Sequence, residues 1–165
     1  MSFIDWQDLF NEVFEDCYDS WILAFLHRND MSQHENLEKN CAKMTRTGYA
    51  HFHCKKCSKT WSSAKAQVIL YHPKSKTSSR KVTLRFYGQQ CKRCSNRNNH
   101  FVDPEFEDDK IKLYLEALYQ KFGWYYYGEE RPETQNQDIN KERQMNGPHV
   151  KELCEACQSG CCERL

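Results

Sequence analysis

The sequence lacks the long apolar runs from which membrane-spanning helices are built. Its longest uninterrupted apolar stretch, Trp21 to Leu26, has six residues, whereas a helix needs about 20 to cross a bilayer. The first ten residues also lack the basic segment followed by an apolar one that marks a secretory signal. We therefore expect a cytoplasmic chain without a transmembrane helix.

The motifs of common catalytic sites are missing as well. There is no Gly-rich phosphate loop, no Gly-x-Ser-x-Gly elbow and no His-Glu-x-x-His pair. We expect no enzyme activity, no catalytic residue and no small-molecule substrate, with a reactive Cys-x-x-Cys pair as the alternative.

A large hydrophobic core is also excluded. The 165 residues have a mean hydropathy of −0.93, and 28% are charged, although 13% are aromatic. This length suits one domain with a modest core, so something besides apolar burial must support the fold.

Acidic residues are absent between Lys39 and Val102, a segment that holds fifteen Lys and Arg. The preceding residues carry a net charge of −8 and the following ones −6. Such a basic segment is suited to phosphate, an anionic membrane surface or an acidic partner. The alternative is intramolecular, with the acidic N-terminal helix covering the basic face. The candidate nucleic-acid or acidic-partner residues are Lys55, Lys56, Lys59, Arg80, Lys81, Arg85, Lys92 and Arg93.

Six of the ten cysteines form three Cys-x-x-Cys pairs, here called knuckles. In a cytosolic chain such pairs indicate metal ligands rather than disulfides. A structural zinc ion takes four thiolate or imidazole ligands, and each knuckle supplies two. A hairpin between the first two knuckles would bring them together, so we predict a zinc-ribbon-like site. Its ligands are Cys54, Cys57, Cys91 and Cys94.

The third knuckle predicts a second, local zinc site. Its ligands would be His149, Cys154, Cys157 and Cys162. Cys161 could replace Cys162, and His53 or His100 could replace His149. Two structural zinc ions, each contributing on the order of 10 kcal/mol to folding, would compensate for the small core.

The apolar spacing predicts an α+β fold. Near-helical spacing indicates an acidic amphipathic helix over Ser2 to about Arg28, and residues 29–46 are expected to form a loop with a short helix. The expected strands are Thr47 to His53 and a hairpin of Trp61 to His72 with Lys81 to Gln89.

A second helix is predicted near 104–122, capped by Asp103 and Pro104 and stopped at Gly123. An aromatic strand or turn, Trp124 to Tyr127, and a flexible loop over 129–148 should follow. We expect one cooperative domain, in which residues 1–46 pack on a zinc module spanning 47–165.

Four motifs together resemble the 3CxxC-type zinc-finger domain of the receptor-transporting proteins. They are Phe52-x-Cys54-x-x-Cys57 with Trp61, Ser63 and Ala64; Phe86-x-Gly88-Gln89-x-Cys91-x-x-Cys94; Tyr125 to Gly128; and Cys154-x-x-Cys157-x-x-Gly160-x-Cys162. The amphipathic N-terminal segment also fits that family.

The resemblance implies an accessory protein that binds cytosolic segments of G-protein-coupled receptors of the odorant and taste kind. Such proteins promote receptor delivery to the cell surface from the cytosolic face of the endoplasmic reticulum or plasma membrane. Many members continue into a C-terminal transmembrane helix, which would lie beyond Leu165.

The alternative function is that of an interferon-type antiviral effector that binds RNA, as one member type does. In this interpretation the basic segment carries Trp61, Tyr71, Phe86 and Tyr87 as stacking surfaces. The opposing interpretation buries these side chains in the hairpin core.

Overall fold

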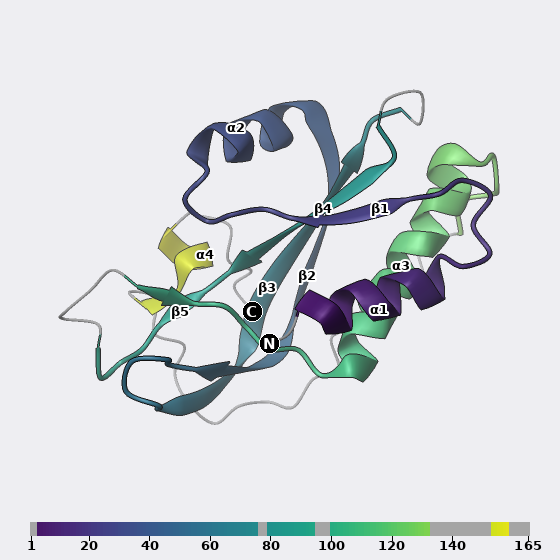
Figure 1. Ribbon diagram of the computed structural model, residues 1–165. Coiled ribbons are helices and arrows are strands. Elements are labelled where there is room, and N and C mark those ends of the chain that lie inside the picture. The colour runs from purple at the N-terminus through teal and green to yellow at the C-terminus, as the bar shows by residue number, and fades with distance from the viewer. Residues whose placement is uncertain (1–2, 76–78, 95–99, 133–152, 159–165) are drawn as a thin grey trace.

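The computed structural model describes residues 3–75, 79–94, 100–132 and 153–158 (Figure 1). Its helices are α1 (Phe3–Val13), α2 (Met31–Asn40), α3 (Asp108–Tyr126) and the short α4 (Glu155–Gln158). Its strands are β1 (Ile22–Phe25), β2 (Cys41–His53), β3 (Thr60–Pro73), β4 (Lys81–Tyr87), β5 (Gln89–Gln90) and β6 (Phe101–Val102). The mixed architecture confirms the predicted α+β class.

A four-stranded sheet in the order β1-β4-β3-β2 forms the centre of the molecule. Its inner strand β3 is buried continuously from Ala66 to Pro73, because helices cover both sheet faces. Successive side chains point to opposite faces, so Val68 and Leu70 join one hydrophobic cluster while Ile69 and Tyr71 join another.

The two faces carry different helices. The larger cluster packs α1 and α3 against the sheet, with Trp6 and Phe10 from α1 and Leu115 from α3 fully buried. The smaller cluster contains Ala156 of α4, and Leu37 of α2 packs against it. In Figure 1, α1 and α3 accordingly lie together on the right, whereas α2 and α4 lie on the left.

The prediction of one helix to about Arg28 is wrong. The helix ends at Val13, and Ile22–Phe25 forms an edge strand parallel to β4, with Ile22 opposite Lys81 and Phe25 opposite Leu84. Leu23 is thereby buried in the larger cluster. The segment forms a strand despite its helical spacing, because it pairs with a strand that lies 59 residues later. This pairing gives hydrogen-bond partners to its backbone and also buries its apolar side chains.

Residues 29–46 contain the predicted short helix, capped by Asp30, whose carboxylate accepts the backbone N–H of Gln33 at 3.1 Å. The rest of this segment is not a loop, because β2 begins at Cys41 and pairs with β3 from Cys41 to His53, with one register shift between Gly48 and Ala50. The antiparallel β3–β4 hairpin is confirmed, with Ile69 opposite Arg85.

The second helix begins and ends later than predicted. Asp103 instead pairs with Arg28, and Glu105 forms a bridge with His51 of β2, so α3 starts at Asp108. The helix also continues through Gly123 and includes Trp124, which excludes the predicted aromatic strand or turn. Its true stop is Gly128, whose φ of 71° is the left-handed conformation that glycine adopts at helix ends.

No helix in the described parts of the chain combines the length and apolar composition that crossing a membrane requires. The predicted loop over 129–148 lies outside the described residues from position 133 onwards.

Candidate metal centre

The first knuckle is the turn that joins β2 to β3. The backbone N–H of Ser58 donates to the Cys54 carbonyl at 2.8 Å, and the N–H of Cys54 donates to the Lys59 carbonyl at 2.9 Å. Ser58 has a positive φ of 61°. This tight reversal places the side chains of Cys54 and Cys57 on the same side of the turn.

The second knuckle follows β5. Its turn is closed by the N–H of Cys94, which donates to the Cys91 carbonyl at 3.1 Å. A hydrogen bond of 3.0 Å from the Trp61 indole Nε1 to the Gln89 Oε1 ties it to the first knuckle. The Trp61 ring in turn stacks on Phe52 at a centroid distance of 5.4 Å.

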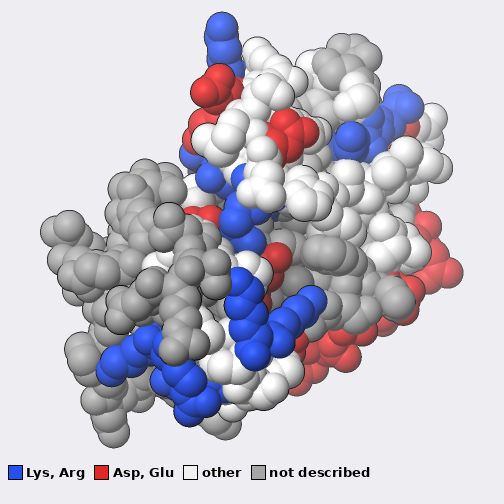
Figure 2. Space-filling model, turned by 60° about the vertical axis from the view of Figure 1, so that its left-hand side comes forward, with Lys and Arg blue, Asp and Glu red and all other residues white. Residues whose placement is uncertain are grey.

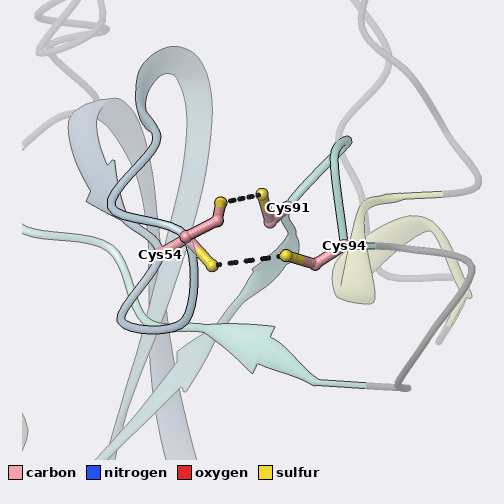
Figure 3. Close-up of side chains that lie close together, drawn as sticks. Cys54, Cys91 and Cys94 are labelled. Atoms are coloured by element: carbon pink, nitrogen blue, oxygen red, sulfur yellow. Dashed lines mark hydrogen bonds between the residues drawn. The ribbon is translucent and has the colours of Figure 1, made fainter.

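The four predicted sulfurs of the first site converge, as Figure 3 shows for three labelled cysteines. All four Sγ atoms lie within 4.8 Å of one another. The Cys57–Cys91 and Cys54–Cys94 sulfur distances are 3.5 and 4.0 Å. These distances are too long for disulfides. They bracket the separation of about 3.8 Å between ligands of a tetrahedral zinc ion with Zn–S bonds of about 2.3 Å.

The electrostatics of this cluster favour a bound cation. Backbone N–H groups of Cys57 and Lys56 lower the pKa of Cys54 to about 7. In contrast, hydrogen bonding to the Cys57 sulfur and burial raise the pKa of Cys94 to about 12. Four crowded thiols therefore do not all ionise on their own, and a divalent cation supplies the compensating charge. Four protein ligands complete a tetrahedron, which is typical of structural zinc.

The third knuckle adjoins this centre. Cys154 is buried and forms a bridge with Gln89, two residues before Cys91. Cys157 lies in α4, and its side chain is outside the described part. His149 and Cys162 lie outside the described residues, as does the alternative ligand Cys161.

The candidate basic residues are divided between distant parts of the sheet. Lys55, Lys56, Lys92 and Arg93 are exposed within the knuckles, and the half-buried Lys59 lies two residues after Cys57. Arg80 and Lys81 lie at the other end of the β3–β4 hairpin, where Arg80 pairs with Asp19 at 3.3 Å. Arg85 is half-buried and lies on β4 between the knuckles and Arg80. Its guanidinium is 4.6 Å from the centre of the Tyr87 ring.

The candidate stacking residues are mostly unavailable. Tyr71, Phe86 and Tyr87 belong to the buried clusters, and the Tyr71 hydroxyl donates to Glu38 at 2.6 Å. Two basic residues of the 39–102 segment pair with acidic residues of the first 38: Lys43 with Glu38 of α2, and Arg80 with Asp19. Glu12 of the acidic helix α1 pairs instead with Lys112 of α3, which lies outside that segment.

Sequence reasoning missed the role of Arg28. Its guanidinium donates to Glu155 from Nε at 2.8 Å and also pairs with Asp103. Glu155 accepts the Gly88 N–H at 2.8 Å as well, so one arginine joins the N-terminal segment to the second and third knuckles. The sequence feature that could have pointed to this role is that Arg28 is the one Lys or Arg among the first 38 residues.

Gly88 is required by this junction. A Cβ at this position would lie 2.7 Å from the Val102 carbonyl oxygen and 2.8 Å from the Arg28 Nη2. Both distances are shorter than van der Waals contact, so a side chain would push Arg28 away from Glu155.

Comparison with known proteins agrees with the geometry of the centre. Residues 47–160 match the family model of a zinc-binding domain, the 3CxxC zinc ribbon. Receptor-transporting protein 4 of Homo sapiens is 26% identical over 98% of this chain and 65% of its own length. The same-named protein of Mus musculus is 29% identical over 67% of the chain and 45% of its own length.

Receptor-transporting protein 3 of Mus musculus is 27% identical over 95% of the chain and 33% of its own length. The chain thus spans between one third and two thirds of the lengths of these relatives. No solved structure matches significantly.

Proposed function

The chain belongs to the 3CxxC zinc-binding domain family of the receptor-transporting proteins, and on this basis we propose that it is a receptor accessory protein. It binds cytosolic segments of G-protein-coupled receptors of the odorant or taste kind and promotes their delivery to the cell surface. It does so as a non-enzymatic protein at the cytosolic face of the endoplasmic reticulum or plasma membrane. The similarity to proteins with this name over nearly the whole chain is the observation that supports it.

In this role the zinc centre is structural: it stabilises the fold that presents the binding surface, and it does not take part in catalysis. The residues that would hold the ion are Cys54, Cys57, Cys91 and Cys94. When bound, the metal supplies a crosslink between two segments about 35 residues apart. Its removal should therefore abolish receptor delivery through loss of fold.

Co-expression with an epitope-tagged odorant receptor tests the proposal by measuring receptor surface density in unpermeabilised cells. We expect the chain to raise that density, Cys91→Ser to abolish the gain and the non-ligand control Cys41→Ser to retain it. Receptor-transporting protein 4 serves as the positive comparison. An unchanged density under conditions in which that relative raises it would exclude the function for this chain.

We also infer a second zinc ion at the third knuckle, held by His149, Cys154, Cys157 and Cys162. Support comes from the burial of Cys154 beside the first centre. Metal analysis of the purified chain should give two zinc ions, and Cys154→Ser should give one. A single ion in the unchanged chain would contradict the second site.

RNA binding is the second candidate function, and the exposed lysines of the first knuckle favour it. With three of the four candidate aromatics buried, binding would depend on phosphate charge rather than base stacking. Fluorescence anisotropy with single-stranded RNA should then show log affinity falling linearly with log salt between about 50 and 200 mM. A flat response would exclude this candidate.

A further inference from the structure

The two knuckles of the first centre present four cations at one end of the molecule. We call Lys55, Lys56, Lys92 and Arg93 the knuckle patch; all four are exposed. Each pair lies between two cysteines whose sulfurs converge within 4.8 Å. The metal centre that joins the knuckles therefore also holds the four charges together.

Three of the four patch cations form no ion pair within the described residues. They are Lys55, Lys56 and Arg93. A zinc ion bound by four thiolates carries a net charge of about −2, so the two knuckles with their four basic side chains carry a net charge of about +2. On the face in Figure 2, a run of Lys and Arg extends from the middle to the lower part, with further basic residues at the top and upper right, while Asp and Glu lie along the lower right edge and near the top.

The surroundings of the patch favour recognition of phosphate by charge alone. Trp61, the nearest candidate for stacking, is already stacked on Phe52 and bonded through its indole to Gln89. Tyr87 and Phe86 are less than one tenth exposed. A surface with clustered cations but no available aromatic platform is poorly suited to unstacked bases and well suited to a layer of anionic headgroups.

We propose that the knuckle patch docks on the anionic cytosolic leaflet of a membrane by binding the phosphate and carboxylate groups of its lipids. This inference rests on the proposed function, in which the chain acts on receptors embedded in such a leaflet. Each Lys or Arg close to an anionic leaflet strengthens binding about fivefold. A net charge of about +2 would hold the chain beside its receptor roughly 25-fold more strongly than a neutral surface.

Vesicle co-sedimentation of the zinc-loaded full chain tests the docking. Pure phosphatidylcholine vesicles are compared with vesicles containing about 30% phosphatidylserine, at about 50 and 200 mM salt. We expect at least tenfold stronger binding to the anionic vesicles at the lower salt, and most of this gain should disappear at the higher salt.

A matched pair of variants assigns the binding to the patch. Lys55→Gln with Lys56→Gln removes two patch charges and should weaken binding about 25-fold. Lys74→Gln with Lys81→Gln removes two exposed charges at the far end of β3 and β4 and should weaken it less than twofold. Measured zinc content confirms that both variants retain the centre.

Three outcomes would overturn the proposal. These are equal binding to both kinds of vesicle, equal losses in the two variants, or binding to single-stranded RNA without binding to anionic vesicles. Since the vesicles contain no receptor, each of these leaves the proposed receptor function standing. Conversely, a failed surface-density assay with intact vesicle binding would reject the receptor function alone.

Discussion

At the scale of single residues, His72 is a fully buried histidine in an aromatic environment. Its Nδ1 lies 2.7 Å from the Tyr126 hydroxyl, and the Phe122 ring packs edge-on against the imidazole. Burial, together with the nearby charge of Lys121, lowers the pKa of His72 to about 4. The imidazole is therefore neutral in the folded protein at neutral pH.

The lowered pKa predicts acid sensitivity. Below about pH 6.5, the ordinary value, the unfolded chain binds a proton at this position and the folded chain does not. The free energy of unfolding should thus fall by up to about 1.4 kcal/mol per pH unit between pH 6.5 and 4. Urea unfolding at several pH values with excess zinc measures this slope, and His72→Gln should make it shallower.

Proton uptake by the zinc-bound thiolates on unfolding is common to the unchanged protein and the variant, so comparing the two slopes isolates the contribution of His72. If His72→Gln keeps the slope of the unchanged protein, His72 is not the group responsible.

At the scale of elements, the end of α3 depends on Gly128. Its φ of 71° costs other residues about 1 kcal/mol. Gly128→Ala should therefore lower the free energy of unfolding by about 1 kcal/mol, and Gly128→Asn by less, since asparagine tolerates this conformation. Denaturant midpoints measure both losses, and equal values for alanine and asparagine would contradict the conformational explanation.

The elements that the sequence could predict are those set by neighbouring residues. Alternation and turn residues identify the β3–β4 hairpin, and Cys-x-x-Cys spacing identifies Cys54, Cys57, Cys91 and Cys94 as one centre. The hairpin and the four-cysteine centre both depend on the conformation of short segments, and the centre needs in addition only that the chain reverses once between the two knuckles. Each is confirmed.

The elements that could not be predicted depend on partners far along the chain. Residues Ile22–Phe25 become a strand because β4 provides a parallel neighbour, and Asp103 does not cap α3 because Arg28 engages it. Helical spacing and capping preferences reflect only interactions between residues close in the sequence. They therefore cannot predict contacts with distant residues that favour a different structure.

At the scale of the whole molecule, Arg28 and Glu155 join opposite ends of the sequence. The side chains are 26% and 14% exposed, so their ion pair is mostly shielded from water. Arg28→Met leaves the Glu155 carboxylate without its cation and should lower the free energy of unfolding by about 2 kcal/mol.

Hydrogen exchange at the Glu155 amide, which donates to the Gly88 carbonyl at 3.1 Å, should accelerate in the same variant. The double variant Arg28→Met with Glu155→Met should recover part of the stability, because no charge is then left unpaired. Unchanged exchange at Glu155 would show that the pair does not hold α4 in place.

Zinc removal should affect the whole molecule. A structural zinc ion contributes on the order of 10 kcal/mol, comparable to the total stability of a domain. Chelation should therefore abolish the near-UV circular dichroism of the buried aromatic residues in one cooperative transition, and zinc addition should restore it. An unchanged spectrum in verified zinc-free protein would contradict the structural role and, with it, the expected single cooperative domain.

The parallel pairing of β1 with β4 also imposes an order in time. The ribosome makes Ile22 59 residues before its partner Lys81. At about 5 to 20 residues per second, this is a delay of roughly 3 to 12 s. Throughout this interval the apolar run Trp21 to Leu26 has no strand to pair with. During this part of its own synthesis, the longest apolar segment of the chain is exposed and can bind a chaperone. A protein proposed to assist the maturation of receptors therefore presents a chaperone-binding segment while it is being made.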